Sequence, residues 1–260
     1  METPAQAAER ILSEHRNRTM FQPLPAERLG DLDYAYAVQD ELVARLLEKG
    51  QDSLAGWKIG LTTARMQKMC GVDTPVAGAI FKARVFASGA SVAIDTYGRL
   101  GIESELAVRL ARPLPKDLGP TPDIVRECLD GVCAAFELVD DRGADYARLD
   151  ACSLVADNSW NAGLVHGRFV AAKDVGDILG REGVLTGNGA VIGQGLTDDV
   201  GGDPLRIVAW LETHLRSKGR ALAAGEWVST GSIVPTHFAE RGKIYTFEIA
   251  GLSTVEVSVV

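Results

Sequence analysis

The chain has 260 residues, of which 46% are hydrophobic and 24% are charged, the balance of an ordinary globular protein. Its formal net charge is −8, and no cluster of lysine and arginine stands out, so nucleic acid is not an expected partner. Four scattered cysteines, no apolar run near the ~18 residues that cross a bilayer, and an N-terminal stretch without a signal-peptide core predict a cytoplasmic protein that contacts no membrane.

The N-terminal segment, residues 1–50, is predicted to be helical. Residues 5–15 form a short candidate helix, which is followed by a break that contains prolines. A second helix is expected to run from Asp31, its N-cap, to about Lys49, with Gly50 at its C-terminal end. Helical spacing predicts a buried stripe on this second helix, made of Leu32, Ala35, Val38, Leu42 and Leu46.

From residue 54 onward the pattern changes to short strands separated by glycine turns. Gly187-Asn188-Gly189 predicts a hairpin turn, and Asp203-Pro204 begins a helix that ends near Lys218. The expected strands are residues 54–61, 84–87, 91–94, 102–110, 133–139, 163–166, 183–186, 190–194, 226–230, 244–249 and 254–259.

Many strands with few helices between them argue against a doubly wound parallel sheet. They favour an α+β fold, in which a curled, β-rich mixed sheet forms a roll or barrel and helices pack outside it. We expect residues 51–260 to form one compact catalytic domain, with the helical residues 1–50 packed on it.

Two glutamates in the strand at 102–110 are predicted to share one face of that strand. Side chains alternate between faces, so Glu103 and Glu105 point the same way, ~7 Å apart along the backbone. The opposite face is almost entirely apolar. Like charges this close repel unless water or a cation lies between them. The pair indicates either a solvated strand face or part of a metal site.

Glu137 stands in a run that otherwise predicts a buried strand. A buried carboxylate without a partner is costly. It could form a structural ion pair with Arg142 or Arg109, or it could be the third ligand of a Mg²⁺ or Mn²⁺ ion held with Glu103 and Glu105.

Four further polar residues occur in apolar or turn settings, and each has a structural alternative. Lys58, between a tryptophan and an isoleucine, could reach solvent or face a carboxylate centre. Asp73 is typical of a turn, and Asp157 follows an apolar segment as a helix cap or turn would. Ser232 is either a turn residue or a contact to a carboxylate.

In combination these segments resemble the fumarylacetoacetate hydrolase superfamily, and within it the branch of 2-keto-4-pentenoate hydratases and 4-oxalocrotonate decarboxylases. The resemblance extends over nearly the whole chain, and its strength lies in the order of the segments, since each one is unspecific alone. The matching segments are Gly56-Trp57-Lys58-Ile59-Gly60-Leu61-Thr62, Gly71-Val72-Asp73-Thr74-Pro75, Glu103-Ser104-Glu105, Glu137-Leu138-Val139-Asp140-Asp141-Arg142, Ala156-Asp157-Asn158 and Gly225-Glu226-Trp227-Val228-Ser229-Thr230-Gly231.

The resemblance implies a β-rich roll and a Mg²⁺ or Mn²⁺ ion on Glu103, Glu105 and Glu137. It also implies a 2-oxo acid substrate that chelates the ion through its carboxylate and 2-oxo oxygens. Lys58 and Asp73 match the lysine and aspartate at the family's reaction centre. There the lysine would add a positive contact to an enolate oxygen, and the aspartate would move protons or orient water.

The resemblance also implies the residues that bind the substrate, and this chain departs from the family pattern beside them. After Ala156-Asp157-Asn158, where small residues are common, the chain has Ser159-Trp160-Asn161, and later it has His237-Phe238 where smaller apolar residues are expected. Both departures concern the substrate pocket rather than the metal ligands. The implied substrate-binding residues are Leu61, Asp157, Trp160 and Ser232.

The function implied first is hydration of a 2-hydroxy-2,4-dienoate to a 4-hydroxy-2-oxo acid, a step typical of aromatic catabolism. Decarboxylation of a 2-oxo-3-enedioate is the main alternative. Hydrolysis of an acylpyruvate ranks lower, because it needs a His/Glu pair and His15 occurs in the pattern of an exposed helix. A non-catalytic partner subunit is a fourth possibility. The branch forms homo-oligomers, so we expect one, alone or mixed with a paralogous decarboxylase or hydratase.

Overall fold

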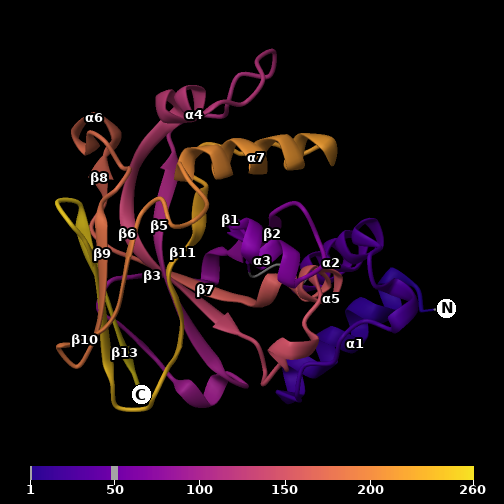
Figure 1. The fold of residues 1–260 in the computed structure, drawn as a ribbon. Coiled ribbons are helices and arrows are strands. Elements are labelled where there is room, and N and C mark those ends of the chain that lie inside the picture. The colour runs from indigo at the N-terminus through magenta and orange to yellow at the C-terminus, as the bar shows by residue number, and fades with distance from the viewer. Residues whose placement is uncertain (1, 48–51) are drawn as a thin grey trace.

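The computed structural model describes residues 2–47 and 52–260. The chain begins with two helices that pack on each other, α1 (Pro4–Asn17) and α2 (Leu32–Leu47) (Figure 1). Asp31 accepts a hydrogen bond from the backbone nitrogen of Tyr34 at 3.0 Å, as expected of an N-cap. The predicted end of α2 and the boundary between residues 50 and 51 lie outside the described residues. Of the predicted stripe, Ala35, Val38 and Leu42 are buried and Leu32 and Leu46 are half-buried.

Eight strands form the larger sheet, which is mixed and runs in the order β2-β1-β11-β5-β6-β7-β3, with β8 paired to β6. The pairs β1–β11 and β3–β7 are parallel, and the other pairs are antiparallel. Its strands are β1 (Leu54–Gly60), β2 (Val76–Phe81), β3 (Val85–Ala87), β5 (Leu100–Leu110), β6 (Leu129–Asp140), β7 (Asn161–His166), β8 (Val170–Ala171) and β11 (Trp227–Phe238).

A second sheet of five strands, in the order β10-β9-β12-β13-β4, packs against the first (Figure 1). Its strands are β4 (Ala90–Val92), β9 (Glu182–Gly187), β10 (Ala190–Leu196), β12 (Ile244–Ile249) and β13 (Ser253–Val259). The predicted hairpin turn is confirmed. Asn188 and Gly189 join β9 to β10 with φ angles of 49° and 82°, the left-handed conformation that a tight two-residue hairpin needs.

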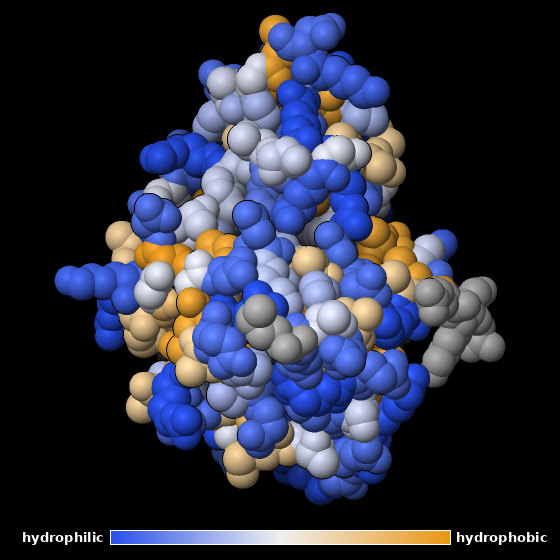
Figure 2. Space-filling view, turned by 90° about the vertical axis from the view of Figure 1, so that its right-hand side faces the viewer, coloured by the Kyte–Doolittle hydropathy of each residue, from blue (hydrophilic) through white to orange (hydrophobic). Residues whose placement is uncertain are grey.

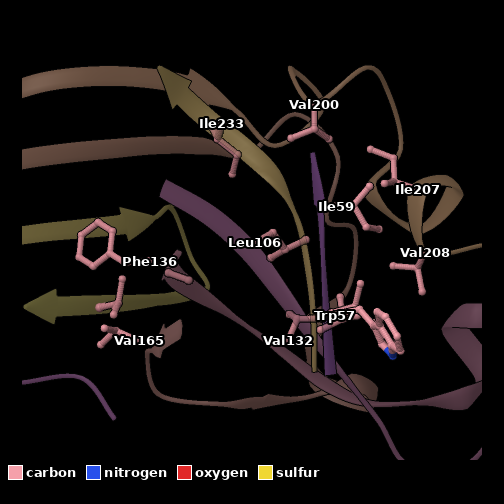
Figure 3. Close-up of a cluster of buried hydrophobic side chains, with 14 of the residues drawn as sticks. Trp57, Ile59, Leu106, Val132, Phe136, Val165, Val200, Ile207, Val208 and Ile233 are labelled. Carbon is pink, nitrogen blue, oxygen red and sulfur yellow. The ribbon is translucent and has the colours of Figure 1, made fainter. Parts of the chain in front are cut away.

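The main core lies between the sheets and under α7 (Pro204–Ser217). Phe136 of β6 contacts Phe247 of β12 with ring centroids 6.2 Å apart, and Figure 3 shows Val208 of α7 beside Ile59 of β1. The remaining helices are α3 (Ala64–Met69), α4 (Pro122–Cys128), α5 (Ala151–Ala156) and α6 (Ala172–Val175). The short 3-10 turns are η1 (Ala26–Arg28), η2 (Lys82–Arg84), η3 (Ile94–Thr96), η4 (Tyr146–Arg148) and η5 (Asn158–Trp160).

The larger sheet curls, and η5 closes the gap between β2 and β7. The side chain of Asn158 donates to the carbonyl of Ala79 at 2.9 Å and accepts from its backbone nitrogen at 2.7 Å. Gly78 makes this close approach possible, because a Cβ there would lie 2.6 Å from the carbonyl oxygen of Asn158. The fold therefore confirms the predicted α+β architecture of mixed, curled sheet with helices outside.

The surface on the side of α1, α2 and α7 is mainly hydrophilic, with hydrophobic residues between the polar ones (Figure 2). Within residues 2–47 and 52–260, no helix is both long and apolar enough to cross a membrane.

Candidate metal centre and active site

Three glutamates meet on the concave face of the curled sheet. Glu103 and Glu137 are direct partners across β5 and β6, and Glu105 lies two residues along β5 on the same face. One carboxylate oxygen from each lies within 4.8 Å of the others. Glu103 and Glu105 therefore share one face of β5, as predicted. The alternative of a solvated strand face is wrong, because Glu105 is completely buried and Glu103 is half-buried.

Neighbouring donors hold two of these carboxylates in place. Ser229 Oγ donates to Glu105 Oε2 at 2.5 Å, and the backbone nitrogen of Gly231 donates to the same oxygen at 2.8 Å. Asn161 Nδ2 donates to Glu137 Oε1 at 2.9 Å. Each of these two carboxylates therefore has one fixed oxygen, which leaves the other available for a ligand.

The remaining oxygens lack donors. Glu105 Oε1 and Glu137 Oε2 are buried without a hydrogen-bond partner, although Glu137 Oε2 lies 3.3 Å from Lys58 Nζ as an ion pair. Glu103 is held by Thr236, whose Oγ1 donates to its Oε1 at 2.6 Å. Buried anionic oxygens without donors are costly, and a hard cation satisfies them.

Lys58 is buried in the same centre. Strand alternation directs its neighbours Trp57 and Ile59 into the main core and Lys58 to the opposite, concave face. The alternative in which Lys58 reaches solvent is therefore wrong. So is the pairing of Glu137 with an arginine, because its cationic partner is Lys58.

The two arginines considered as partners of Glu137 lie in other ion pairs. Arg109 pairs with Asp130, and Arg142 pairs with Asp157 and Glu14.

The excess of negative charge among the buried groups of this centre favours the binding of a cation. Burial raises the pKa of Glu137 to about 7 and the pKa of Glu105 well above its usual range. Burial alone would lower the pKa of Lys58, but the three carboxylates, Glu137 foremost, raise it. When all four groups are ionised, three carboxylates face one ammonium, so two negative charges remain to be balanced.

The turn η5 carries three consecutive residues in the left-handed conformation. Asn158, Ser159 and Trp160 have φ angles of 48°, 50° and 58°. Such a run in residues other than glycine is strained, and strain of this kind clusters at functional sites. Hydrogen bonds from Asn158 to Ala79 and from Ser159 Oγ to the carbonyl of Ala77 at 3.2 Å hold the turn. The turn thereby presents Asn161 to Glu137.

Trp160 is buried beside this centre, in contact with Phe21 at 5.2 Å and Tyr146 at 5.8 Å between ring centroids. Its Nε1 has no hydrogen-bond partner. Trp160 and Asn161 also border a cavity of about 260 Å³. The other residues that line this cavity are His15, Leu46, Asp52, Phe81, Arg84, Thr96, Tyr97, Asp140, Asn158 and Ala162.

Asp157 has ion-pair partners at both carboxylate oxygens. Its Oδ2 accepts from Arg142 at 2.7 Å, and its Oδ1 lies 2.5 Å from His15 Nε2. These partners lower the pKa of Asp157, although burial by itself would raise it. His15 is half-buried, whereas its sequence pattern predicted an exposed helix residue. Its Nε2 contacts Asp157 rather than a glutamate, and this contact links α1 to the segment that carries Trp160 and Asn161.

Leu61 and Asp73 lie in the segments that follow β1 and precede β2. Leu61 is buried with φ 52°, and Gln67 Nε2 donates to its carbonyl at 2.9 Å. Asp73 is exposed, in a bend close to Val76, the first residue of β2. The antiparallel register places Gly60 opposite Val76, so both segments lie at one end of this strand pair.

Ser232 stabilises an irregular stretch of β11. Its Oγ accepts from the backbone nitrogen of Ser104 at 3.1 Å and donates to the carbonyl of Val234 at 2.6 Å. The carboxylate contact considered for Ser232 is made instead by Ser229.

The groups that hold the carboxylates are ones that sequence reasoning missed: Asn161, Ser229, the Gly231 nitrogen and Thr236. A serine directly after Trp227 and Val228, in the strand predicted at 226–230, is the signal that could have identified Ser229. Thr236 could not be identified in this way, because register shifts in β11 change which residues face β5.

Comparison with known proteins agrees with this geometry. The family model for the C-terminal domain of fumarylacetoacetate (FAA) hydrolase matches residues 63–260. A 2-keto-4-pentenoate hydratase of Paraburkholderia phymatum is 31% identical over 253 residues, which cover 96% of this chain and 95% of the relative. A 2-hydroxyhexa-2,4-dienoate hydratase of Comamonas testosteroni is 30% identical over 82% of this chain and 81% of the relative.

Among solved structures, 4-oxalocrotonate decarboxylase from Pseudomonas putida G7, complexed with magnesium and adipate, has a similar fold. It superimposes with a TM-score of 0.89 and 27% sequence identity, and the match covers 100% of this chain and 98% of that one. The likeness therefore includes the N-terminal helices as well as the two sheets.

Proposed function

Because this chain belongs to the fumarylacetoacetate hydrolase family, we propose that it is a divalent-metal-dependent hydro-lyase. It adds water to a 2-hydroxy-2,4-dienoate and gives a 4-hydroxy-2-oxo acid. The observation that carries the proposal is the set of three converging carboxylates, with Glu105 Oε1 buried without a partner and Glu137 Oε2 paired only with the buried Lys58. The names of the hydratase relatives support the same reaction.

The residues present fit a hard divalent cation. Glu103, Glu105 and Glu137 offer only oxygen ligands, the set that Mg²⁺ and Mn²⁺ prefer. The two unbalanced negative charges match the charge of one such ion. When bound, such an ion would be chelated by the carboxylate and 2-oxo oxygens of the substrate, and its positive charge would stabilise negative charge on the oxygen at carbon 2. The choice of Mg²⁺ over Mn²⁺ stays a prediction.

Lys58 supplies the second positive group of the reaction centre. Its ammonium is buried and already oriented by Glu137, so it needs little reorganisation to contact the oxygen at carbon 2. Preorganised charge in a site that excludes water is worth more than the same charge in solvent. Lys58 therefore favours the enolate form of the substrate, which both ketonisation and water addition require.

Asp73 is proposed to move a proton or to orient the attacking water. It lies beside the start of β2, at the same end of the β1–β2 pair as Leu61, and general acid–base catalysis of this kind is worth ~10²–10⁴ in rate. Leu61 and Trp160 belong to one buried apolar cluster and are proposed to contact the substrate chain. Substrate contacts of Asp157 and Ser232 stay predictions, since both side chains have protein partners.

The test is to incubate the purified protein with Mg²⁺ and 2-hydroxypenta-2,4-dienoate. We expect the dienol absorbance to fall as a 4-hydroxy-2-oxo acid forms, identified by mass spectrometry. If no 2-hydroxy-2,4-dienoate is turned over, the proposed reaction is wrong.

Decarboxylation of a 2-oxo-3-enedioate is the second candidate, favoured by the full-length likeness to the decarboxylase structure. The same lysine and carboxylate centre would accept electrons from a departing carbon dioxide. Release of carbon dioxide from such a dicarboxylate, without hydration of dienoates, would favour it. Acylpyruvate hydrolysis receives less support, because His15 contacts Asp157 rather than a glutamate at its Nε2.

The setting of the enzyme in the cell also stays a prediction. We expect a cytoplasmic homo-oligomer, alone or with a paralogous decarboxylase or hydratase, that takes part in aromatic catabolism. A native mass measurement, with and without the partner enzyme, tests the assembly and the idea of a non-catalytic subunit.

A further inference from the structure

Three aromatic side chains from distant parts of the sequence form one wall beside the carboxylate centre. Trp160 of η5 contacts Tyr146 of η4, with ring centroids 5.8 Å apart, and Tyr146 contacts Phe238, at the end of β11, at 6.4 Å. Phe21 supports Trp160 from behind at 5.2 Å. We call Trp160, Tyr146 and Phe238 the aromatic wall.

The two ends of the aromatic wall lie close in sequence to residues that hold the carboxylates. Phe238 pairs with Gly101, two residues before Glu103 on β5, so it lies on the same face of the sheet as Glu103, which Thr236 holds. Trp160 directly precedes Asn161, the donor to Glu137. Burial and the nearby Asp141 raise the pKa of Tyr146, and Glu103 contributes to the same shift, which places Tyr146 within electrostatic reach of the centre.

The outer part of the wall is open to solvent. Phe238 is 40% exposed and Tyr146 is 38% exposed, whereas Trp160 is only 5% exposed. The rings therefore lead from the surface toward the buried carboxylates.

The charged groups at the wall neutralise one another. Arg99 donates to both oxygens of Asp141, at 2.7 and 2.5 Å, and to the carbonyl of Ala144 at 3.0 Å. Tyr146 donates its hydroxyl to Asp141 at 3.0 Å. The guanidinium of Arg99 also lies over the ring of Phe238, 4.4 Å from its centroid. Arg99 is therefore held by a carboxylate, a carbonyl and a ring rather than being available to a second anion.

Behind the wall the arrangement is similar. Arg142, whose guanidinium lies 5.8 Å from the ring centroid of Phe21, pairs with Asp157 and Glu14. In the part of the chain that the structure describes, both arginines that contact these rings are thus already neutralised.

We propose that the aromatic wall receives the end of the substrate that is remote from carbon 1, and that it selects an apolar end over a second carboxylate. The inference rests on the proposed function for the chemistry at carbons 1 and 2. An apolar group gains from leaving water against aromatic rings. A carboxylate in the same place loses its hydration and finds no free cation. The expected substrate class is a monocarboxylic 2-hydroxy-2,4-dienoate with an alkyl or aryl substituent at carbon 5.

The test compares two stable 2-oxo acids of equal length, 2-oxohexanoate and 2-oxoadipate, which differ in the distal carboxylate. Their binding to the Mg²⁺-loaded protein is measured by calorimetry. We expect 2-oxohexanoate to bind at least about tenfold more tightly, the scale of discrimination that an apolar pocket achieves. Phe238→Ala should reduce this ratio at least several-fold. Ile244→Ala, which removes a similarly exposed apolar side chain from β12, should leave the ratio unchanged.

Equal or tighter binding of 2-oxoadipate would overturn the inference, and so would a ratio that Phe238→Ala leaves intact. The binding ratio does not depend on turnover, so the two proposals can fail separately. If 2-oxohexanoate binds more tightly as predicted but no dienoate is hydrated, the hydratase reaction is wrong and the apolar subsite stands. If dienoates are hydrated but 2-oxoadipate binds more tightly, the hydratase reaction stands and the apolar subsite is wrong. If neither acid binds the loaded protein, both proposals are wrong.

Discussion

Glu105 Oε1 is buried without a hydrogen-bond partner, and the only partner of the buried Glu137 Oε2 is the Lys58 ammonium at 3.3 Å, while the other oxygens of these two carboxylates are held by Ser229 and Asn161. At the scale of single residues this asymmetry is the clearest sign of a ligand. Buried polar atoms normally have partners, so a carboxylate with one satisfied and one unsatisfied oxygen indicates that a missing group completes it.

Glu105→Gln tests this assignment. The amide keeps the shape of the side chain but removes the charge, so we expect binding of Mn²⁺ to fall by at least about tenfold, since a charged contact of this kind contributes ~1.5–3 kcal/mol. The circular dichroism spectrum should not change. Glu248→Gln, at an exposed position on β12, serves as the matched control. Unchanged affinity in Glu105→Gln would remove Glu105 from the ligand set.

The pKa of Glu137, raised to about 7 by burial, predicts how the affinity for metal depends on pH. Below this pKa the metal must displace a proton from the carboxylate, and above it the carboxylate is already free. The affinity for Mn²⁺ should therefore rise with pH through about 7, by up to about tenfold per unit for each proton released, and Glu105, whose pKa burial also raises, adds to the rise. Calorimetry at pH 6, 7 and 8 measures this, and a flat profile would contradict it.

Lys58→Ala should slow turnover without abolishing metal binding. The variant loses the preorganised positive charge beside the carboxylates, and loss of one such group typically costs ~10²–10³ in kcat. Steady-state kinetics at saturating Mg²⁺ gives the rate, and thermal unfolding checks that the buried substitution leaves the protein folded. A folded variant with full turnover would show that Lys58 has no part in the reaction.

At the scale of elements, the buried carboxylate of Asp157 links helix α1 to the start of η5. Asp157, at the end of α5, is held between Arg142 and His15 of α1. The N-terminal helix is therefore attached to the segment that presents Trp160 and Asn161. Loss of this attachment should affect both the stability and the geometry of the site.

Asp157→Asn leaves Arg142 buried with a weaker partner, which typically costs ~3–5 kcal/mol in the free energy of unfolding. The effect also depends on pH. Because the folded state lowers the pKa of Asp157, its stabilising contribution is present above its unfolded pKa and is lost as the pH falls through the folded value. Urea unfolding at pH 7 should thus separate the variant from the parent more than unfolding at pH 3.

The exposed substitution Asp117→Asn is the control for this comparison. Equal stability of Asp157→Asn and the parent at pH 7 would contradict the account.

Local patterns predicted those elements whose signal lies in neighbouring residues. The alternation in β5 placed Glu103 and Glu105 on one face, and Asp203 with Pro204 gave the start of α7. The strand β2 was not predicted, because its buried run of small and apolar residues shows no alternation. The left-handed turn η5 was not predicted either, since Asn158, Ser159 and Trp160 adopt that backbone only through bonds to β2.

At the scale of the whole molecule, the site depends on contacts between residues far apart in the sequence. Its charged side chains come from β1, β5 and β6, and their hydrogen-bond donors come from β7 and β11. Strand alternation, the apolar setting of Glu137 and the resemblance to a family together gave the candidate ligands and Lys58, but the supporting donors depend on strand register and on the bulges of β11. The aromatic wall, which joins positions 146, 160 and 238, likewise follows only from the folded chain.

The most direct test is the metal dependence of dienoate hydration. The protein is stripped with a chelator, reloaded with Mg²⁺ and assayed with 2-hydroxypenta-2,4-dienoate in both states. We predict that only the reloaded protein bleaches the dienol absorbance, because in the proposed site Glu103, Glu105 and Glu137 would hold the ion that the substrate chelates. Equal rates of hydration in the stripped and reloaded protein would contradict a catalytic metal centre on these three carboxylates.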